Sequence, residues 1–265
     1  MEILHRSSAG VRFAVFFVLA CVFTWSLLPF AADSMPLALV ALCGPAAAAF
    51  VVAVFSGRAA LGDLAARTTE WRHSLKWYLA ALLLPLPISA FRSLLEYIAI
   101  GSGSIEFLPI SVLGLIVFVL VLGEEIGWRG FAMPLLLPRL GPVWSSVVLG
   151  TLWALWHLPL FYMPSMPQFG SPFAAFVIYT ISLSAVLTYF GLSTRFSVVI
   201  ATLFHGSVNT FGFVNAAAGP GLRGWSNALS YGLAALLLGI IAWRINLRTH
   251  ANRDDADDLP VGSTT

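Results

Sequence analysis

Long apolar segments recur along almost the whole chain and restrict its possible folds more than any other feature. A helix needs about 20 apolar residues to cross the hydrocarbon core of a membrane, and each segment has roughly this length. Hydrophobic residues make up 59% and charged residues only 10% of the 265 residues, which is far from the composition of a water-soluble domain. We count eight such segments, at residues 11–31, 35–55, 77–95, 107–133, 142–163, 172–192, 197–216 and 225–243.

The segments are apolar on every face, which favours helices, because the strands of a membrane barrel alternate apolar and polar residues. The short connections between them predict antiparallel neighbours. The sequence therefore predicts an all-α fold, a polytopic integral membrane bundle of about eight transmembrane helices. We expect one membrane domain over residues 1–243 and a polar, disordered cytoplasmic tail over residues 244–265, which contains an acidic cluster.

Basic residues are distributed unevenly between the expected connections. All 14 lysines and arginines except Arg92 and Arg223 fall on one side if the N-terminus is inside. Because cytoplasmic connections carry the excess of basic residues, we expect a multi-pass protein of the cell membrane with both termini in the cytoplasm. This topology accounts for the basic residues, so the expected surroundings are membrane lipids and no nucleic acid is expected as a partner.

Two adjacent glutamates, Glu124 and Glu125, interrupt the fourth apolar segment. An ionisable group at membrane depth costs at least ~2.5 kcal/mol and marks a functional site by default. Glu125 and Arg129 are four residues apart, so they share a helix face and can form a buried ion pair. Glu124 points about 100° away and is a candidate general base. The alternative is an ion pair that only packs helices. Gly123 and Gly127 should allow another helix to approach closely.

Three further polar side chains are expected at similar depth on other segments: His157, His205 and Asn209. Counted along each helix at ~1.5 Å per residue, they and Glu124 could meet in one cavity that opens toward the cytoplasm. His205 and Asn209 share a helix face, and there they could donate hydrogen bonds to an oxyanion or simply join helices. By itself, His157 could equally be a packed core residue.

The residue types indicate an activated water, because no serine, cysteine or aspartate stands where a hydrolase nucleophile would. Glutamate and histidine can activate water directly or through a bound metal. The sequence has no HExxH motif, which removes the familiar zinc protease arrangement. No cofactor is expected, although the residues alone leave zinc open.

Three motifs together resemble the type II CAAX prenyl endopeptidase family, also called the Abi or CPBP family, which includes the Ras-converting enzymes. The run that starts at Glu124 and ends at Arg129 matches EExxxR. Trp153-Ala-Leu-Trp-His157 is similar to FxxxH, with tryptophan in place of phenylalanine, and His205-Gly-Ser-Val-Asn209 matches HxxxN. The motifs occur in the family's order, within a core of about residues 107–215.

The resemblance implies an eight-helix intramembrane protease that uses a glutamate-activated water and no covalent intermediate or metal. Glu124 would be the general base and His157 its partner in activating water. His205 and Asn209 would form the oxyanion hole, and Glu125 with Arg129 a supporting ion pair. The implied substrate is a peptide or lipidated protein that is cleaved near its C-terminus, as in CAAX processing, or a membrane-associated peptide, as in the processing of bacteriocins and other peptides. The resemblance leaves the substrate open between these.

Two other classes of function share some of these features. A non-catalytic immunity or scaffold protein could keep the fold and bind a partner, but it would not need all four polar residues together. A proton-coupled transporter could use the same carboxylates and histidines as a relay. The sequence shows no inverted repeat and no pair of interrupted helices of the kind that transporters use.

Overall fold

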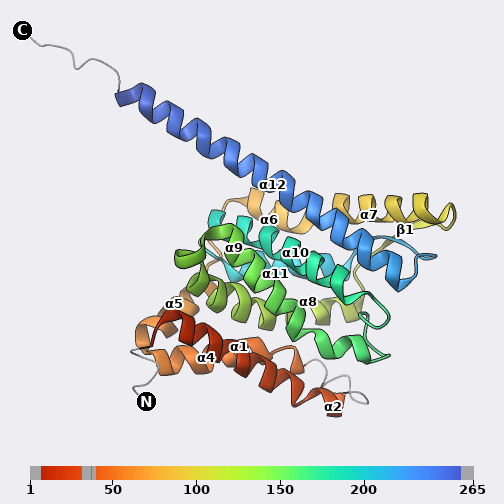
Figure 1. Ribbon diagram of the computed structural model, residues 1–265, viewed down its shortest axis with the longest axis horizontal. Coiled ribbons are helices and arrows are strands. Elements are labelled where there is room, and N and C mark those ends of the chain that lie inside the picture. Colours follow the sequence, from red (N-terminus) through yellow and green to blue (C-terminus); the bar gives the residue numbers. More distant parts are fainter. Residues whose placement is uncertain (1–6, 32–36, 38–39, 258–265) are drawn as a thin grey trace, which may run out of the picture.

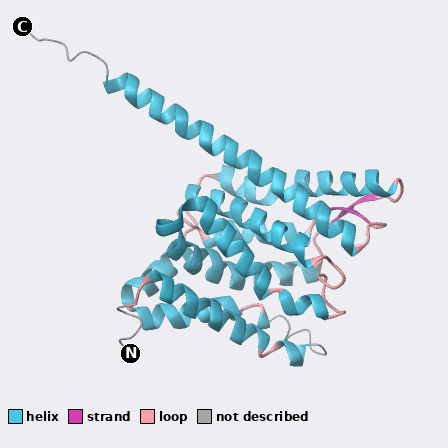
Figure 2. Ribbon diagram, viewed as in Figure 1, coloured by secondary structure: helices cyan, strands magenta, loops and turns pink. Residues whose placement is uncertain are grey.

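The computed structural model describes residues 7–31, 37 and 40–257, and most of them are helical (Figure 2). In chain order the elements are α1 (Ala9–Trp25), α2 (Leu28–Ala31), α4 (Gly44–Ser56), α5 (Arg58–Thr68), α6 (Leu75–Leu83), α7 (Pro85–Ile100), β1 (Ile105–Leu108), α8 (Val112–Glu125), the π-helix η1 (Ile126–Ala132), α9 (Met133–Trp156), the 3-10 helix η2 (Leu158–Tyr162), α10 (Phe173–Ser193), α11 (Val198–Thr210), β2 (Gly212–Asn215) and α12 (Pro220–Asp257).

The helices form three layers (Figure 1). One outer layer contains α1 and α4, the middle layer contains α8 to α11, and the other outer layer contains α6, α7 and α12. Within and between the layers, α9 packs on α10, α8 on α11 and α4 on η1. The middle layer is therefore covered on both faces, which suits the polar residues that it carries.

Four helical stretches are long and apolar enough to cross a membrane: Ala9–Phe30, Leu75–Ile100, Phe173–Ser193 and Pro220–Ala242. Each of the eight expected segments contains a helix. However, α4 and α11 have 13 residues each and α8 has 14, fewer than the ~20 that span the hydrocarbon core alone. The structure thus supports a multi-pass helical membrane protein, whereas eight crossings and their orientation stay predictions.

A short antiparallel sheet departs from the expected all-α fold. Its strands β1 and β2 pair Ile105 with Asn215 and Leu108 with Gly212. Residues 107–108 and 212–215 were expected inside the fourth and seventh helical segments, and that expectation was wrong. Because β1 precedes α8 and β2 follows α11, the sheet holds the N-terminal end of α8 beside the C-terminal end of α11.

The fourth and fifth segments are joined differently from what the sequence suggested. The fourth expected segment ended at residue 133, but the chain passes through Pro134 into α9 without a break, since Ala132 and Met133 keep helical dihedral angles and Met133 N donates to the Trp128 carbonyl oxygen. The chain turns instead at Gly141, whose φ of 68° is readily adopted only by glycine. The seven-residue π-helix η1 precedes α9; such widened turns are frequent at functional sites.

The last helix is longer than expected. The sequence analysis ended the membrane domain at residue 243 and assigned residues 244–265 to a disordered tail, but α12 continues to Asp257. Residues 244–257 are therefore helical, and residues 258–265 lie outside the described part of the chain. The boundary between a membrane domain and a tail consequently falls inside one element.

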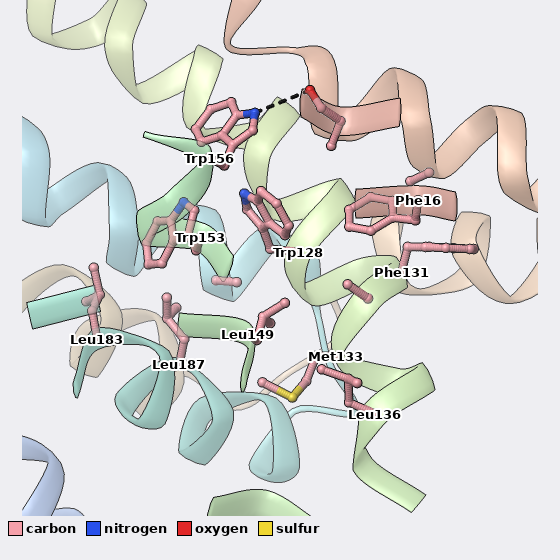
Figure 3. Close-up of a cluster of buried hydrophobic side chains, with 14 of the residues drawn as sticks. Phe16, Trp128, Phe131, Met133, Leu136, Leu149, Trp153, Trp156, Leu183 and Leu187 are labelled. Carbon is pink, nitrogen blue, oxygen red and sulfur yellow. Dashed lines mark hydrogen bonds between the residues drawn. The ribbon is translucent and has the colours of Figure 1, made fainter. Parts of the chain in front are cut away.

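Large aromatic side chains fill the core between α1 and the middle layer (Figure 3). Trp128 of η1 packs edge-on against Phe16 and Trp156, with ring centroids 5.3 and 5.8 Å away. Trp156 donates a hydrogen bond from Nε1 to Thr24 Oγ1, at 3.0 Å. Trp153 lies beside this group on α9 (Figure 3), where the core meets the polar cluster.

Candidate active site

The glutamate pair lies at the C-terminal end of α8, immediately before the π-helix. Both side chains are buried, with 4% of Glu124 and none of Glu125 exposed. Two buried carboxylates in an apolar bundle need hydrogen-bonding or ionic partners, because the free energy lost on removing them from water is otherwise not compensated. The structure gives them different partners, as the helical geometry predicted.

Glu125 connects the π-helix to α11 through a single carboxylate oxygen. Its Oε1 accepts hydrogen bonds from Arg129 Nη1, at 3.1 Å, and from His205 Nδ1, at 2.8 Å. The ion pair with Arg129 is thus present, and the Arg129 guanidinium also lies 4.3 Å above the ring of Trp153, a cation–π contact. The bond from His205 was not expected from the sequence. It ties α11 directly to the glutamate pair.

Glu124 contacts Trp153, which the sequence analysis named only as the replacement for a phenylalanine of the family motif. Trp153 Nε1 donates a hydrogen bond to Glu124 Oε2, at 3.0 Å. A phenylalanine, which the family motif has here, could not make this bond. The available signal was the tryptophan itself, because the N–H of a buried indole usually has a hydrogen-bond partner.

His157 lies at the C-terminal cap of α9, next to the same tryptophan. Its Nδ1 is 2.8 Å from the Trp153 carbonyl oxygen, which can only accept, so Nδ1 carries the proton. In the neutral ring Nε2 then holds a lone pair that can accept a proton or orient a water. Pro159, in the first turn of η2, ends α9 at this point.

Asn209 completes the cluster one turn beyond His205 on α11. Its Nδ2 lies 3.2 Å from His205 Nε2, so the two side chains share a face as predicted. Since His205 donates from Nδ1 to Glu125, its neutral Nε2 accepts from the Asn209 amide. The rest of this amide is exposed and is free to donate to a substrate oxygen.

Trp153 is the common neighbour of the predicted catalytic residues. It hydrogen-bonds Glu124, and its ring centroid lies 5.0 Å from that of His205 and 5.8 Å from that of His157. The structure therefore brings residues of α8, α9 and α11 together around one indole. Among the residues that the structure describes, no group of three or more His, Cys, Asp or Glu side chains is placed to hold a metal ion.

A cavity of about 310 Å³ adjoins this cluster. Asn209 belongs to its wall, and so does Phe176, whose ring lies 5.2 Å from that of His157. The wall is formed by α7, α10, α11, α12, the turn before α10 and the residue between α11 and β2. Its residues are Pro85, Ser89, Arg92, Pro167, Gln168, Ser171, Phe176, Tyr179, Val208, Asn209, Phe211, Arg223, Gly224, Asn227 and Tyr231.

If both termini are in the cytoplasm, the position of the cavity does not agree with the expectation that it opens toward the cytoplasm; the orientation itself stays a prediction. The cavity wall includes the N-terminal turns of α10 and α12 and three residues of the turn before α10. These segments lie near the β1–β2 sheet, at the end of the bundle opposite the basic helix α5 (Figure 1). The depth estimates predicted that the polar residues lie together. They could not predict at which end of the bundle the side chains leave a cavity.

Comparison with known proteins agrees with the three motifs. Residues 105–211, which include every predicted site residue, match the family of Rce1-like type II CAAX prenyl endopeptidases. The protein named CAAX prenyl protease 2 of Methanococcus maripaludis is 28% identical over 140 residues, which are 49% of this chain and 49% of that protein. The chain thus spans about half the length of this curated relative. The resemblance inferred from the motifs is confirmed.

Proposed function

We propose that this chain, which carries an Rce1-like type II CAAX prenyl endopeptidase domain over residues 105–211, is an intramembrane endopeptidase that cleaves a peptide or lipidated protein near its C-terminus. The observation that supports this most is the arrangement around Trp153: a buried carboxylate, two histidines and an exposed amide next to a cavity. These are the groups that water-activated hydrolysis of a peptide bond requires.

In the proposed reaction, Glu124 removes a proton from a water molecule, and the hydroxide attacks the carbonyl carbon of the scissile bond. Trp153 holds Glu124 Oε2 in place by its hydrogen bond, and His157 Nε2 orients the water. When the tetrahedral intermediate collapses, the C–N bond breaks and the proton held by Glu124 passes to the leaving amine. The products are a carboxylic acid and an amine, and no covalent enzyme intermediate forms.

The oxyanion of this intermediate would be stabilised from α11. The exposed amide of Asn209 donates a hydrogen bond to it, and His205 holds that amide through the 3.2 Å contact with Nε2. Glu125 and Arg129 do not touch the substrate in this mechanism. They position His205 and the π-helix, because Glu125 Oε1 binds both side chains.

We also propose that the chain crosses the cell membrane eight times, with both termini in the cytoplasm. The support is the uneven distribution of basic residues and a helix in each apolar segment. In this orientation α5 faces the cytoplasm, and the cavity near Asn209 faces the opposite side. Substrates would then reach the site from that side or from within the membrane.

The decisive experiment compares the parent protein with Glu124→Gln on peptides that do and do not carry a lipid. We expect the parent to cleave, and the variant to lose at least ~10²-fold in kcat, which is the usual contribution of a general base. Equal cleavage by both forms would remove Glu124 from its role. Activity of the parent should survive thorough chelation, and loss that zinc restores would instead favour a metal mechanism.

A further inference from the structure

One arginine in the cavity wall has no acidic partner. Arg223, in the first turns of α12, donates from Nη2 to the carbonyl oxygens of Asn215 and Ala218, at 3.1 and 2.9 Å. Its Nε is buried without a hydrogen-bond partner, and no carboxylate of the described residues lies within ion-pair distance of its guanidinium. The site thus holds a full positive charge that only carbonyl dipoles offset.

The second arginine of the wall is already neutralised. Arg92 Nε lies 3.6 Å from Oε1 of Glu96, a fully buried carboxylate that also accepts from Ser226, at 2.7 Å. Arg92 further donates to the Phe213 carbonyl oxygen and to Asn227 Oδ1, at 2.5 and 3.4 Å. Since the wall contains no aspartate or glutamate, its net charge is the uncompensated charge of Arg223.

A buried guanidinium nitrogen without an acceptor costs free energy until a ligand supplies one. Two helices, α10 and α12, also begin at the cavity, and their N-terminal ends add partial positive charge. The cavity therefore favours an anion. A guanidinium with free N–H groups best fits a planar carboxylate, which it can bind through two hydrogen bonds.

We infer that Arg223, supported by Arg92 and Asn227, binds the C-terminal carboxylate of the peptide substrate. This inference rests on the proposed function. Because the same cavity contains Asn209, a chain end held at Arg223 would place a peptide bond a short distance upstream beside the catalytic residues. The enzyme would then select substrates by their free C-terminus, and the cavity would receive the short fragment that is released.

The test measures cleavage of paired peptides that differ only in a free acid or an amide at the C-terminus. We expect the parent to prefer the acid by at least about tenfold in kcat/KM, as hydrogen bonds to a charged group imply. Arg223→Gln should lower cleavage of the acid to the level of the amide and leave the amide unchanged. Arg223→Lys should keep part of the preference, and Arg58→Gln, an exposed arginine of α5, should keep all of it.

Binding of the same fluorescent peptides to Glu124→Gln separates this inference from the proposed function. If Glu124→Gln binds the acid more tightly than the amide and the double variant Glu124→Gln/Arg223→Gln binds both equally, the carboxylate site is supported even if no peptide is cleaved. Equal binding of acid and amide overturns it, as does an equal loss of both on substitution of Arg223. If the parent cleaves both peptides equally well, the endopeptidase proposal stands and only the carboxylate site falls.

Discussion

At the scale of single residues, the site depends on three hydrogen bonds to two adjacent carboxylates. Glu125 takes the basic partners, Arg129 and His205, while the one donor to Glu124 among the described residues is the indole N–H of Trp153. A carboxylate locked in an ion pair is a poor base, whereas one held by a single neutral donor can accept a proton from water. The different partners explain how two identical neighbouring side chains can serve structure and chemistry separately.

Trp153→Phe tests this division, because it keeps an aromatic ring at this position and removes the donor to Glu124. We expect kcat to fall about tenfold, the kinetic equivalent of ~1.4 kcal/mol for one hydrogen bond, with little change in KM. Trp128→Phe is the matched control, since Trp128 is equally buried but its Nε1 has no partner among the described residues. Steady-state kinetics that show full kcat in Trp153→Phe would leave the hydrogen bond without a catalytic role.

At the scale of elements, the end of α8 and the π-helix η1 pack closely against α4. Sequence reasoning predicted that Gly123 and Gly127 allow a close helix approach, and the structure confirms it. A Cβ at Gly123 would lie 3.0 Å from Cys43 Sγ, and one at Gly127 only 2.7 Å from the backbone of Pro45. The widened turn itself could not be predicted, because it arises from packing between layers and not from local preference.

Gly127→Ala should therefore destabilise the protein by ~1–3 kcal/mol, the usual cost of overpacking, because the obstacle is the backbone of α4. The control is Gly62→Ala in α5, where a Cβ meets nothing within 4 Å. That change should be neutral or stabilise by up to ~1 kcal/mol, since alanine favours a helix. Unfolding in detergent gives both values, and an unchanged midpoint for Gly127→Ala would contradict the packing described above.

At the scale of the whole molecule, the charge distribution and the cavity lie at opposite ends of the bundle. The basic helix α5 is near one end, and the wall formed by α10, α12 and residues 167–171 is near the other (Figure 1). The orientation of the chain consequently decides which compartment supplies the substrate. The sequence predicts orientation from charge, but it could not show where the cavity would open.

Single cysteines report this orientation directly. After Cys21 and Cys43 are replaced, cysteine is introduced at the exposed positions Ala59, in α5, or Ser165, in the turn before α10. A membrane-impermeant maleimide should label Ser165→Cys on intact cells and Ala59→Cys only after permeabilisation. The reverse pattern would place the cavity in the cytoplasm and refute the proposed orientation.

Sequence alone was enough to predict a helical membrane protein, its apolar segments and the polar residues that belong together by motif. These properties depend on composition and on helical spacing, so they can be found within a few turns of one segment. The contacts between separate helices could be learned only from the folded molecule. His205 bonds Glu125, 80 residues away, Trp153 bonds Glu124, and Arg223 lines the same cavity as Asn209 without a counter-ion among the described residues. Such pairings arise where separate helices meet, and local sequence does not specify which faces come into contact.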